Sequence, residues 1–227
     1  MQETDSAYSG FAELRAIEES LRRYNADIVR NLSGCLEGRK RVLDFGAGIG
    51  TLAMEWEKQT GVKPDCLEVD ARQRQMILER GFRCYAAIDS ASKTFEAIYS
   101  SNVLEHIEDD LGALVSMYSL LEEGGVLALY VPAFMCLFSE LDRSAGHYRR
   151  YGRAELIHKT MRAGFRVVKC EYSDCLGFAA WLANGATFPG AAALRLYDRW
   201  IYPVSRVLDG VGMRRVAGKN LILIAKK

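Results

Sequence analysis

The clearest candidates for chemistry in this chain of 227 residues are a glycine loop and an acidic residue that follows it. Three alternating glycines, Gly46, Gly48 and Gly50, come directly after a short apolar run and before a helical stretch. Bare backbone at such a loop can approach a nucleotide-like ligand closely. Glu68 ends the next apolar run, where a carboxylate can accept hydrogen bonds from both hydroxyls of a ribose, with Asp70 as the second choice. The pattern therefore predicts a site for a ligand that carries a ribose.

A second concentration of reactive side chains occupies residues 140–151, just before a predicted helix. Its twelve positions hold two acids, one imidazole, three arginines and two tyrosines. Because imidazole accepts a proton near neutral pH, we predict that His147 is a general base or substrate orienter and that Asp142 fixes its ring. A solvated charged loop, or an arginine paired with one of the acids, is the alternative. We expect the substrate to be held by the residues that end the segment: Arg149, Arg150 and Tyr151.

The apolar periodicity indicates the elements that must position these groups. From residue 41 onward, short apolar runs alternate with helical stretches, which predicts a mostly parallel, buried sheet of the α/β class. The strands are expected at RVLDF, DCLEV, EAIYSS, GVLALYV, FRVVKCEYS and NLILIAKK. The helices between them are expected at 51–60, 71–80, 109–122 and 152–163, and one amphipathic helix over 11–32 precedes the sheet.

The charge, the cysteines and the N-terminal sequence indicate which partners and which cellular compartment to expect. Thirty basic residues against twenty-nine acidic ones give a formal charge of +1, so we expect no nucleic-acid partner and a small ligand instead. The six cysteines are scattered and never form a CxxC pair, which is typical of reduced core residues in a cytoplasmic protein. The N-terminus is polar, and no run reaches the roughly 18 apolar residues of a membrane span, so neither export nor a transmembrane anchor is expected.

Three motifs, in order and spacing, resemble those of class I S-adenosylmethionine-dependent methyltransferases. LDFGAGIGTLA is similar to the family's glycine motif, CLEVD to its ribose-binding strand end, and YSSNVLEHIEDD to its fourth strand. The stretch GHYRRY resembles a bacterial group, of type 11 or 12, that acts on small molecules or in saccharide pathways. The resemblance covers roughly residues 40–170. It implies a Rossmann-like, doubly wound, seven-stranded sheet with an N-terminal helix and an inserted helical hairpin before the last strand.

The resemblance also implies which residues bind the donor, S-adenosylmethionine. The glycines would line its methionine and ribose portions, Glu68 would hold the ribose, and Asp89 would lie beside the adenine unless it only forms a turn. Tyr24, on the N-terminal helix, would close over the donor as a substrate residue, or be a core residue of that helix. His106 is a candidate base, although a role in bracing the loop is favoured. The implied donor-binding residues are Asp44, Gly46, Ala47, Gly48, Gly50, Glu68, Val69, Ile88, Asp89 and Asn102.

Segment 175–212 is unusually apolar and aromatic. It could form a substrate lid, a dimer contact, a shallow membrane-contacting hairpin for a lipid-linked acceptor, or plain core packing. We expect one methyltransferase domain over 1–227, divided into an N-terminal helical cap, a donor-binding core, an active-site loop and an apolar helical insertion: 1–38, 39–134, 135–152 and 175–212.

These observations predict O-methylation of a small-molecule, sugar or lipid-linked glycan acceptor, with His147 as base. No metal is expected, because the sequence shows no cluster of carboxylates and histidines with ligand spacing. The alternatives are an NAD(P)-dependent oxidoreductase, since Gly48, Gly50 and Ala53 also fit G-x-G-x-x-A, and a non-catalytic methyltransferase-like binding module. A glycine turn that only packs helix on strand is the structural alternative.

Overall fold

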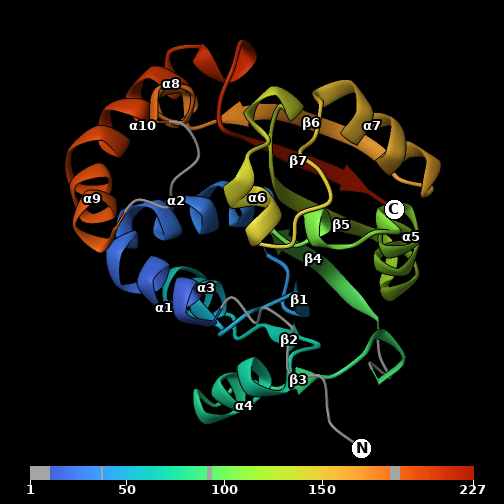
Figure 1. Ribbon diagram of the computed structural model, residues 1–227. Coiled ribbons are helices and arrows are strands. Elements are labelled where there is room, and N and C mark those ends of the chain that lie inside the picture. Colours follow the sequence, from blue (N-terminus) through green and yellow to red (C-terminus); the bar gives the residue numbers. More distant parts are fainter. Residues whose placement is uncertain (1–10, 37, 91–93, 185–189) are drawn as a thin grey trace, which may run out of the picture.

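The centre of the computed structural model is a seven-stranded sheet in the order β3-β2-β1-β4-β5-β7-β6 (Figure 1). The structure describes residues 11–36, 38–90, 94–184 and 190–227. The strands are parallel except β7, which runs antiparallel to β5 and β6. The predicted mostly parallel sheet is therefore confirmed. Strand order reverses between β1 and β4, and ligands of open α/β sheets bind beyond the carboxyl ends of the strands at such a point.

The observed elements follow the predicted alternation closely. The strands are β1 Val42–Phe45, β2 Asp65–Leu67, β3 Cys84–Tyr85, β4 Phe95–Ser101, β5 Leu121–Pro132, β6 Arg166–Ser173 and β7 Asn220–Lys226. The helices between them are α3 Thr51–Thr60, α4 Ala71–Glu79, α5 Asp110–Leu120, α6 Glu140–Ser144 and α7 Arg153–Arg162. The first and last residues of four of these five helices lie within two residues of the predicted bounds. The fifth, α6, lies inside the segment that we had expected to be a loop.

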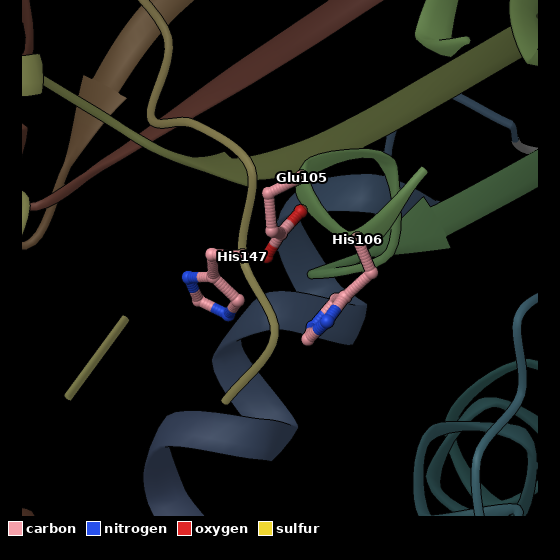
Figure 2. A group of neighbouring side chains, drawn as sticks. All are labelled: Glu105, His106 and His147. Carbon is pink, nitrogen blue, oxygen red and sulfur yellow. The ribbon is translucent and has the colours of Figure 1, made fainter. Parts of the chain in front are cut away.

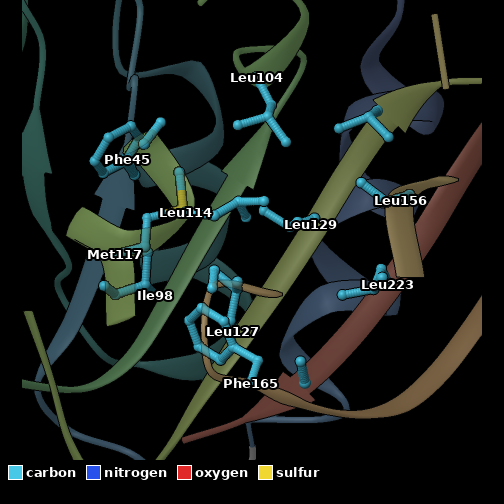
Figure 3. Close-up of a cluster of buried hydrophobic side chains, with 14 of the residues drawn as sticks. Phe45, Ile98, Leu104, Leu114, Met117, Leu127, Leu129, Leu156, Phe165 and Leu223 are labelled. Atoms are coloured by element: carbon cyan, nitrogen blue, oxygen red, sulfur yellow. The ribbon is translucent and has the colours of Figure 1, made fainter. Parts of the chain in front are cut away.

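Helices cover both faces of the sheet, which explains why its strands are almost continuously apolar. On one face, Leu114 and Met117 of α5 and Leu156 of α7 pack into a cluster with strand residues such as Ile98 (Figure 3). On the other face, the ring of Trp56 in α3 stacks on Tyr99 of β4 with 4.3 Å between centroids. The two cores fix the carboxyl edge of the sheet, where the loops that carry polar residues emerge.

The N-terminal helix is broken, contrary to the single helix that we predicted. It forms α1, Phe11–Ser20, and α2, Arg22–Ser33, and the backbone at Leu21 is not helical (φ −114°, ψ 49°). The carboxylate of Asp198 accepts hydrogen bonds from the backbone N–H groups of Arg23 and Tyr24 at 3.0 and 2.8 Å. These are donors that a helix N-terminus leaves unpaired. A side chain distant in sequence therefore caps the start of α2.

The insertion before β7 is a helical hairpin, as predicted. Its first arm is α8, Cys175–Asn184, and its second arm is a continuous helical run of α9 Ala191–Leu196, a π-helical turn at Tyr197–Ile201 and α10 Tyr202–Gly210. Within the described part of the chain, every helix is too short or too polar to cross a bilayer. Residues 1–10, on which the expectation about export rests, lie outside the described residues.

The cysteines are free and divide into two groups. Cys66, Cys170 and Cys175 are buried, as expected for core residues, whereas Cys35 and Cys136 are exposed. The prediction of a core position is therefore wrong for the last two.

Candidate active site

The glycine loop joins β1 to α3 and needs its glycines for two reasons. Gly46, Gly48 and Gly50 have φ values of 78°, 57° and 82°, a region that other residues rarely adopt. A Cβ atom on Gly46 would also lie 2.4 Å from Cγ2 of Val103. The loop therefore presents bare backbone at the carboxyl edge of the sheet, as the sequence predicted.

Glu68 connects the end of β2 to this loop. Its buried carboxylate accepts hydrogen bonds from the backbone N–H groups of Gly48 at 2.8 Å and Asp70 at 2.9 Å. Burial raises the pKa of Glu68, and these N–H groups oppose the rise. Asp70, the second choice for the ribose, instead accepts a hydrogen bond from the backbone N–H of Gln73 at 2.8 Å and caps α4. Glu68 is thus the carboxylate that adjoins the loop.

Other residues that the sequence assigned to the donor site differ in their exposure. Val69, beside Glu68, has 74 % of its surface exposed, and half-buried Ile88 precedes exposed Asp89 in a 3₁₀ turn. Asp44 in β1 is buried, and its Oδ2 finds no hydrogen-bond partner among the described residues. Burial raises the pKa of Asp44 to about 7. Oδ2 of Asp44 is therefore available to pair with a cationic group of the donor.

Two further elements border the same loop. Asn102, directly after β4, has a φ of 53° and an exposed side chain. From the other side, α1 covers the loop, because a Cβ atom on Gly48 would lie 3.3 Å from Leu14. Glu18 of α1 also pairs with Arg80 at 2.9 Å. Buried Ala47 completes the predicted donor-binding set.

His147 and Asp142 form a hydrogen-bonded pair, as predicted. Nδ1 of His147 lies 2.9 Å from Oδ1 of Asp142, whose other oxygen accepts from the backbone N–H and hydroxyl of Ser139. Arg150 binds both carboxylate oxygens of Asp142 through Nε and Nη2, at 2.8 and 3.1 Å. Although burial opposes it, the hydrogen bonds from His147 and Arg150 lower the pKa of Asp142 to about 2. An ionised carboxylate therefore fixes the ring of His147.

Arg149 and Tyr151 are not brought to this pair. The guanidinium of Arg149 binds Asp110 at 2.8 Å and donates to the carbonyl oxygens of Ile107 and Glu108. The buried hydroxyl of Tyr151 donates to Asp110 at 3.0 Å and to the carbonyl oxygen of Leu104. These bonds hold the segment after β4 against the segment before α7. They give both residues a structural function, and the substrate role that the sequence predicted for them stays a prediction.

Three polar residues near this edge were missed in the sequence: Tyr130, Lys219 and Asn220. The hydroxyl of Tyr24 bonds to the hydroxyl of Tyr130 in β5, at 3.0 Å, and to the amide of Asn220 in β7, at 2.9 Å. Tyr24 is buried in the core cluster of its helix, which was the alternative to a substrate role. Lys219, just before β7, places its ammonium 5.0 Å from the ring centroid of Trp181, and burial lowers its pKa. The antiparallel direction of β7 brings its first residues to the carboxyl edge. A single sequence gives no sign of that direction.

Trp181 belongs to α8 and joins the insertion to the His147 loop. Its indole N–H donates to the carbonyl oxygen of Leu137 at 2.8 Å, and its ring lies 4.6 Å from the guanidinium of Arg150. In the same helix, Phe178 packs on Phe134 after β5, with 5.2 Å between the ring centroids. The first arm of the insertion therefore borders the predicted active-site loop.

Glu105 and His106, next to each other after β4, meet His147 across the loop (Figure 2). The rings of His106 and His147 are edge to face, with 4.5 Å between centroids. Burial raises the pKa of Glu105 to about 8, and both its carboxylate oxygens lack hydrogen-bond partners among the described residues. The expectation that no carboxylate and histidine cluster exists is therefore wrong. Its members come from two loops, which sequence spacing does not connect.

Comparisons with known proteins agree with this geometry. A family model described as a methyltransferase domain matches residues 17–169. No match is found among curated proteins. A methyltransferase of Archaeoglobus fulgidus, dependent on S-adenosylmethionine, is 18 % identical with a TM-score of 0.63, and the match covers 93 % of this chain and 98 % of that one.

Two other solved structures have the same fold and different described activities. Phosphoethanolamine N-methyltransferase 2 of Haemonchus contortus, in complex with S-adenosyl-L-methionine, is 17 % identical with a TM-score of 0.62 over 90 % of this chain and 52 % of that one. An O-methyltransferase family protein of Burkholderia thailandensis is 12 % identical with a TM-score of 0.61 over 93 % of this chain and 58 % of that one. At these identities the likeness concerns the fold, and it does not indicate the methylated atom.

The family model covers most of the chain, including the glycine loop, the end of β2 and the segment that carries His147. The comparisons support S-adenosylmethionine as the donor, as the sequence predicted. The chain therefore belongs to the family of methyltransferase domains with the class I, Rossmann-like fold.

Proposed function

We propose that this methyltransferase acts on the hydroxyl group of a small-molecule, sugar or lipid-linked acceptor and that His147 is its general base. The observation that carries the proposal is the pair of His147 with the buried, ionised Asp142, on a loop at the carboxyl edge of the sheet. In a methyltransferase of this fold, that edge is where donor and acceptor meet.

The donor supplies an electrophilic methyl group on a sulfonium, and the protein supplies alignment and a proton acceptor. Asp142 accepts the hydrogen bond from Nδ1 of His147, so the lone pair of Nε2 is free. Nε2 then takes the proton of the acceptor hydroxyl as its oxygen attacks the methyl carbon. Arg150 and Ser139 act as positioning residues, since they hold Asp142 in place.

Two cationic groups next to Trp181 favour an acceptor that combines an anionic group with an apolar part. Nη1 of Arg150 is buried without a hydrogen-bond partner among the described residues, and Lys219 lies on the same indole ring. A carboxylate or phosphate would pair with both cations. This composition supports the substrate-lid function of α8 and suits the small-molecule and saccharide-pathway group that GHYRRY resembles.

The second arm of the insertion carries a stripe of exposed apolar side chains. Apolar residues of this arm are spaced along one face of a helix and have more than half of their surface exposed: Leu196, Trp200, Val204, Val207 and Val211. Exposed Arg195 and Arg199 flank them. We propose that this stripe contacts an anionic membrane surface, as a lipid-linked acceptor would require. A dimer contact is the alternative.

The test begins with calorimetric titration of S-adenosylhomocysteine into the protein, with NADH as a control. We expect micromolar binding of the first ligand, about −8 kcal/mol, and none of the second. An acceptor screen then compares wild type with His147→Ala. Binding of NADH alone would favour the oxidoreductase alternative, and transfer that is unchanged in His147→Ala would remove His147 as the base.

A further inference from the structure

Three potential ligand side chains converge where the segment after β4 meets the loop before α7. Glu105 and His106 lie in the 3₁₀ turn Leu104–His106, and His147 comes from the other segment. One ligand atom from each lies within 4.8 Å of the other two, and Figure 2 shows the side chains gathered around a common space.

Glu105 is the member of the cluster whose side chain lacks a partner in the described part of the chain. Its side chain is fully buried, and neither carboxylate oxygen has a hydrogen-bond partner among the described residues. Burying an unpaired carboxylate is costly, and a cation bound to it removes most of that cost. The guanidinium of Arg150 offsets this cost only in part: it binds both oxygens of Asp142, and the pKa of Glu105 stays raised by burial although the charge of Arg150 lowers it.

His147 is already oriented as a ligand. Its Nδ1 is bonded to the ionised Asp142, which leaves Nε2 as the ring nitrogen available to a ligand. Histidines that bind metals commonly have their other ring nitrogen bonded to a carboxylate in this way, because the bond fixes the tautomer and the ring orientation. Arg150 and Ser139 in turn hold Asp142, so the orientation is built into the loop.

We propose that Glu105, His106 and His147 form a binding site for a divalent transition-metal ion such as Zn²⁺. One carboxylate and two imidazoles are the ligand set of zinc sites that keep a further position for water or substrate. The same set suits Fe²⁺, whereas Mg²⁺ and Ca²⁺ prefer oxygen ligands throughout. The proposed metal site lies beside the residues to which the proposed function assigns the acceptor.

The consequence for catalysis rests on the proposed function. Nε2 of His147 cannot bind a metal and accept a proton at the same time. A bound ion would therefore keep His147 from acting as the base, so the metal-bound protein and the protein in which His147 takes the proton are alternative states of the same site.

The test measures metal binding in the full chain without donor or acceptor. Protein stripped with a chelator is titrated with Zn²⁺ by calorimetry, and with Co²⁺ by visible absorption, which reports the coordination geometry. We expect one ion per chain in wild type. His106→Ala and Glu105→Gln should each weaken binding at least tenfold and change the Co²⁺ spectrum.

The matched control is His158→Ala, because His158 is an exposed histidine on α7 outside the cluster. This variant should bind as wild type does. Absence of binding in wild type, or equal binding in all four proteins, would overturn the metal site. Circular dichroism checks folding, and exposed His106 makes His106→Ala the safer of the two variants. Since the assay reads no methyl transfer, its failure is separate from a failure of the proposed function.

Discussion

Nδ1 of His147 lies 2.9 Å from Oδ1 of Asp142, and that carboxylate is 1 % exposed. The pair joins a half-buried imidazole to a carboxylate that is itself held in place. Ser139 binds this carboxylate through its backbone N–H and its hydroxyl, and Arg150 binds it through its guanidinium. The ring can therefore neither rotate freely nor exchange tautomers without losing a charge-assisted hydrogen bond. Such an arrangement directs the reactivity of His147 to Nε2.

Replacing His147 should reduce turnover rather than donor binding. A positioned general base contributes about 10²- to 10⁴-fold to a rate, so we expect a loss of that order in kcat for His147→Ala. The measurement is the formation of S-adenosylhomocysteine with an acceptor identified by the screen. The affinity for S-adenosylhomocysteine should stay within about twofold, and His158→Ala should match wild type. A rise in KM at constant kcat would assign His147 to acceptor binding only.

Glu68→Ala should weaken the binding of S-adenosylhomocysteine. Hydrogen bonds to a charged group contribute about 1.5–3 kcal/mol, so the loss should be about 10- to 100-fold. The variant also releases the N–H of Gly48, which adds to the effect through the glycine loop. Calorimetry measures the difference. The control is Glu123→Gln, a 90 % exposed carboxylate at the start of β5, and equal affinities in all three proteins would contradict the ribose role.

Asp44 should make the protein less stable as pH rises. Burial raises its pKa to about 7, whereas the unfolded chain has a value of about 3.9. Between about pH 4 and pH 7 the folded state holds a proton that the unfolded state has lost, so the free energy of unfolding falls through this window. Asp44→Asn removes this fall.

The difference in free energy of unfolding between Asp44→Asn and wild type should therefore grow with pH. It should be near zero at pH 4 and reach at most about 4 kcal/mol, in favour of the variant, at pH 8. Urea denaturation at several pH values measures it. The same variant should bind S-adenosylhomocysteine more weakly at pH 8. A difference that shrinks with rising pH would show that Asp44 is ionised and paired in the folded state.

Replacing Arg149 should affect the stability of the protein, whereas replacing Arg150 should affect its turnover. Arg149 holds Asp110, so Arg149→Met should lower the free energy of unfolding by about 1–3 kcal/mol and leave the acceptor KM unchanged. Arg150→Met should reduce kcat, because it frees Asp142 and with it the ring of His147. Urea denaturation and steady-state kinetics on both variants measure these effects. An increase in acceptor KM for Arg149→Met would support the substrate role that the sequence predicted for Arg149.

The apolar stripe should bind vesicles that contain anionic lipid. Trp200→Asp introduces a charge into its centre and should reduce co-sedimentation with phosphatidylserine vesicles several-fold, whereas Leu78→Asp, at an exposed position of α4, should not. Added salt should weaken the binding, because Arg195 and Arg199 contribute to it. If wild type instead forms a dimer that Trp200→Asp dissociates, and no vesicle binding occurs, the stripe is a dimer contact.

The sequence predicted most of the fold because its signals are local. Short apolar runs and helical apolar patterns, with glycines where helices stop, indicate an alternating order of strands and helices that the sheet confirms. The donor loop is equally local, since the positive φ of Gly46 and its neighbours and the position of Glu68 follow from short stretches of chain. These features depend on what each residue type can adopt, which a single sequence displays.

Tertiary structure decided which partner each polar side chain meets. Asp198 caps α2 from the far end of the chain and so breaks a helix that looks continuous in the sequence. Arg149 and Arg150 are adjacent and identical in type, yet one binds Asp110 and the other Asp142.

The amino-acid sequence by itself determined the α/β order of elements, the glycine loop and the acid that adjoins it, because backbone preference and apolar period are properties of nearby residues. Only the tertiary structure decided that Glu105 and His106 meet His147, and that Lys219 reaches the same edge as Arg150. The physical reason is that such contacts depend on strand order, strand direction and the side to which each side chain points, and those are fixed when the whole core packs.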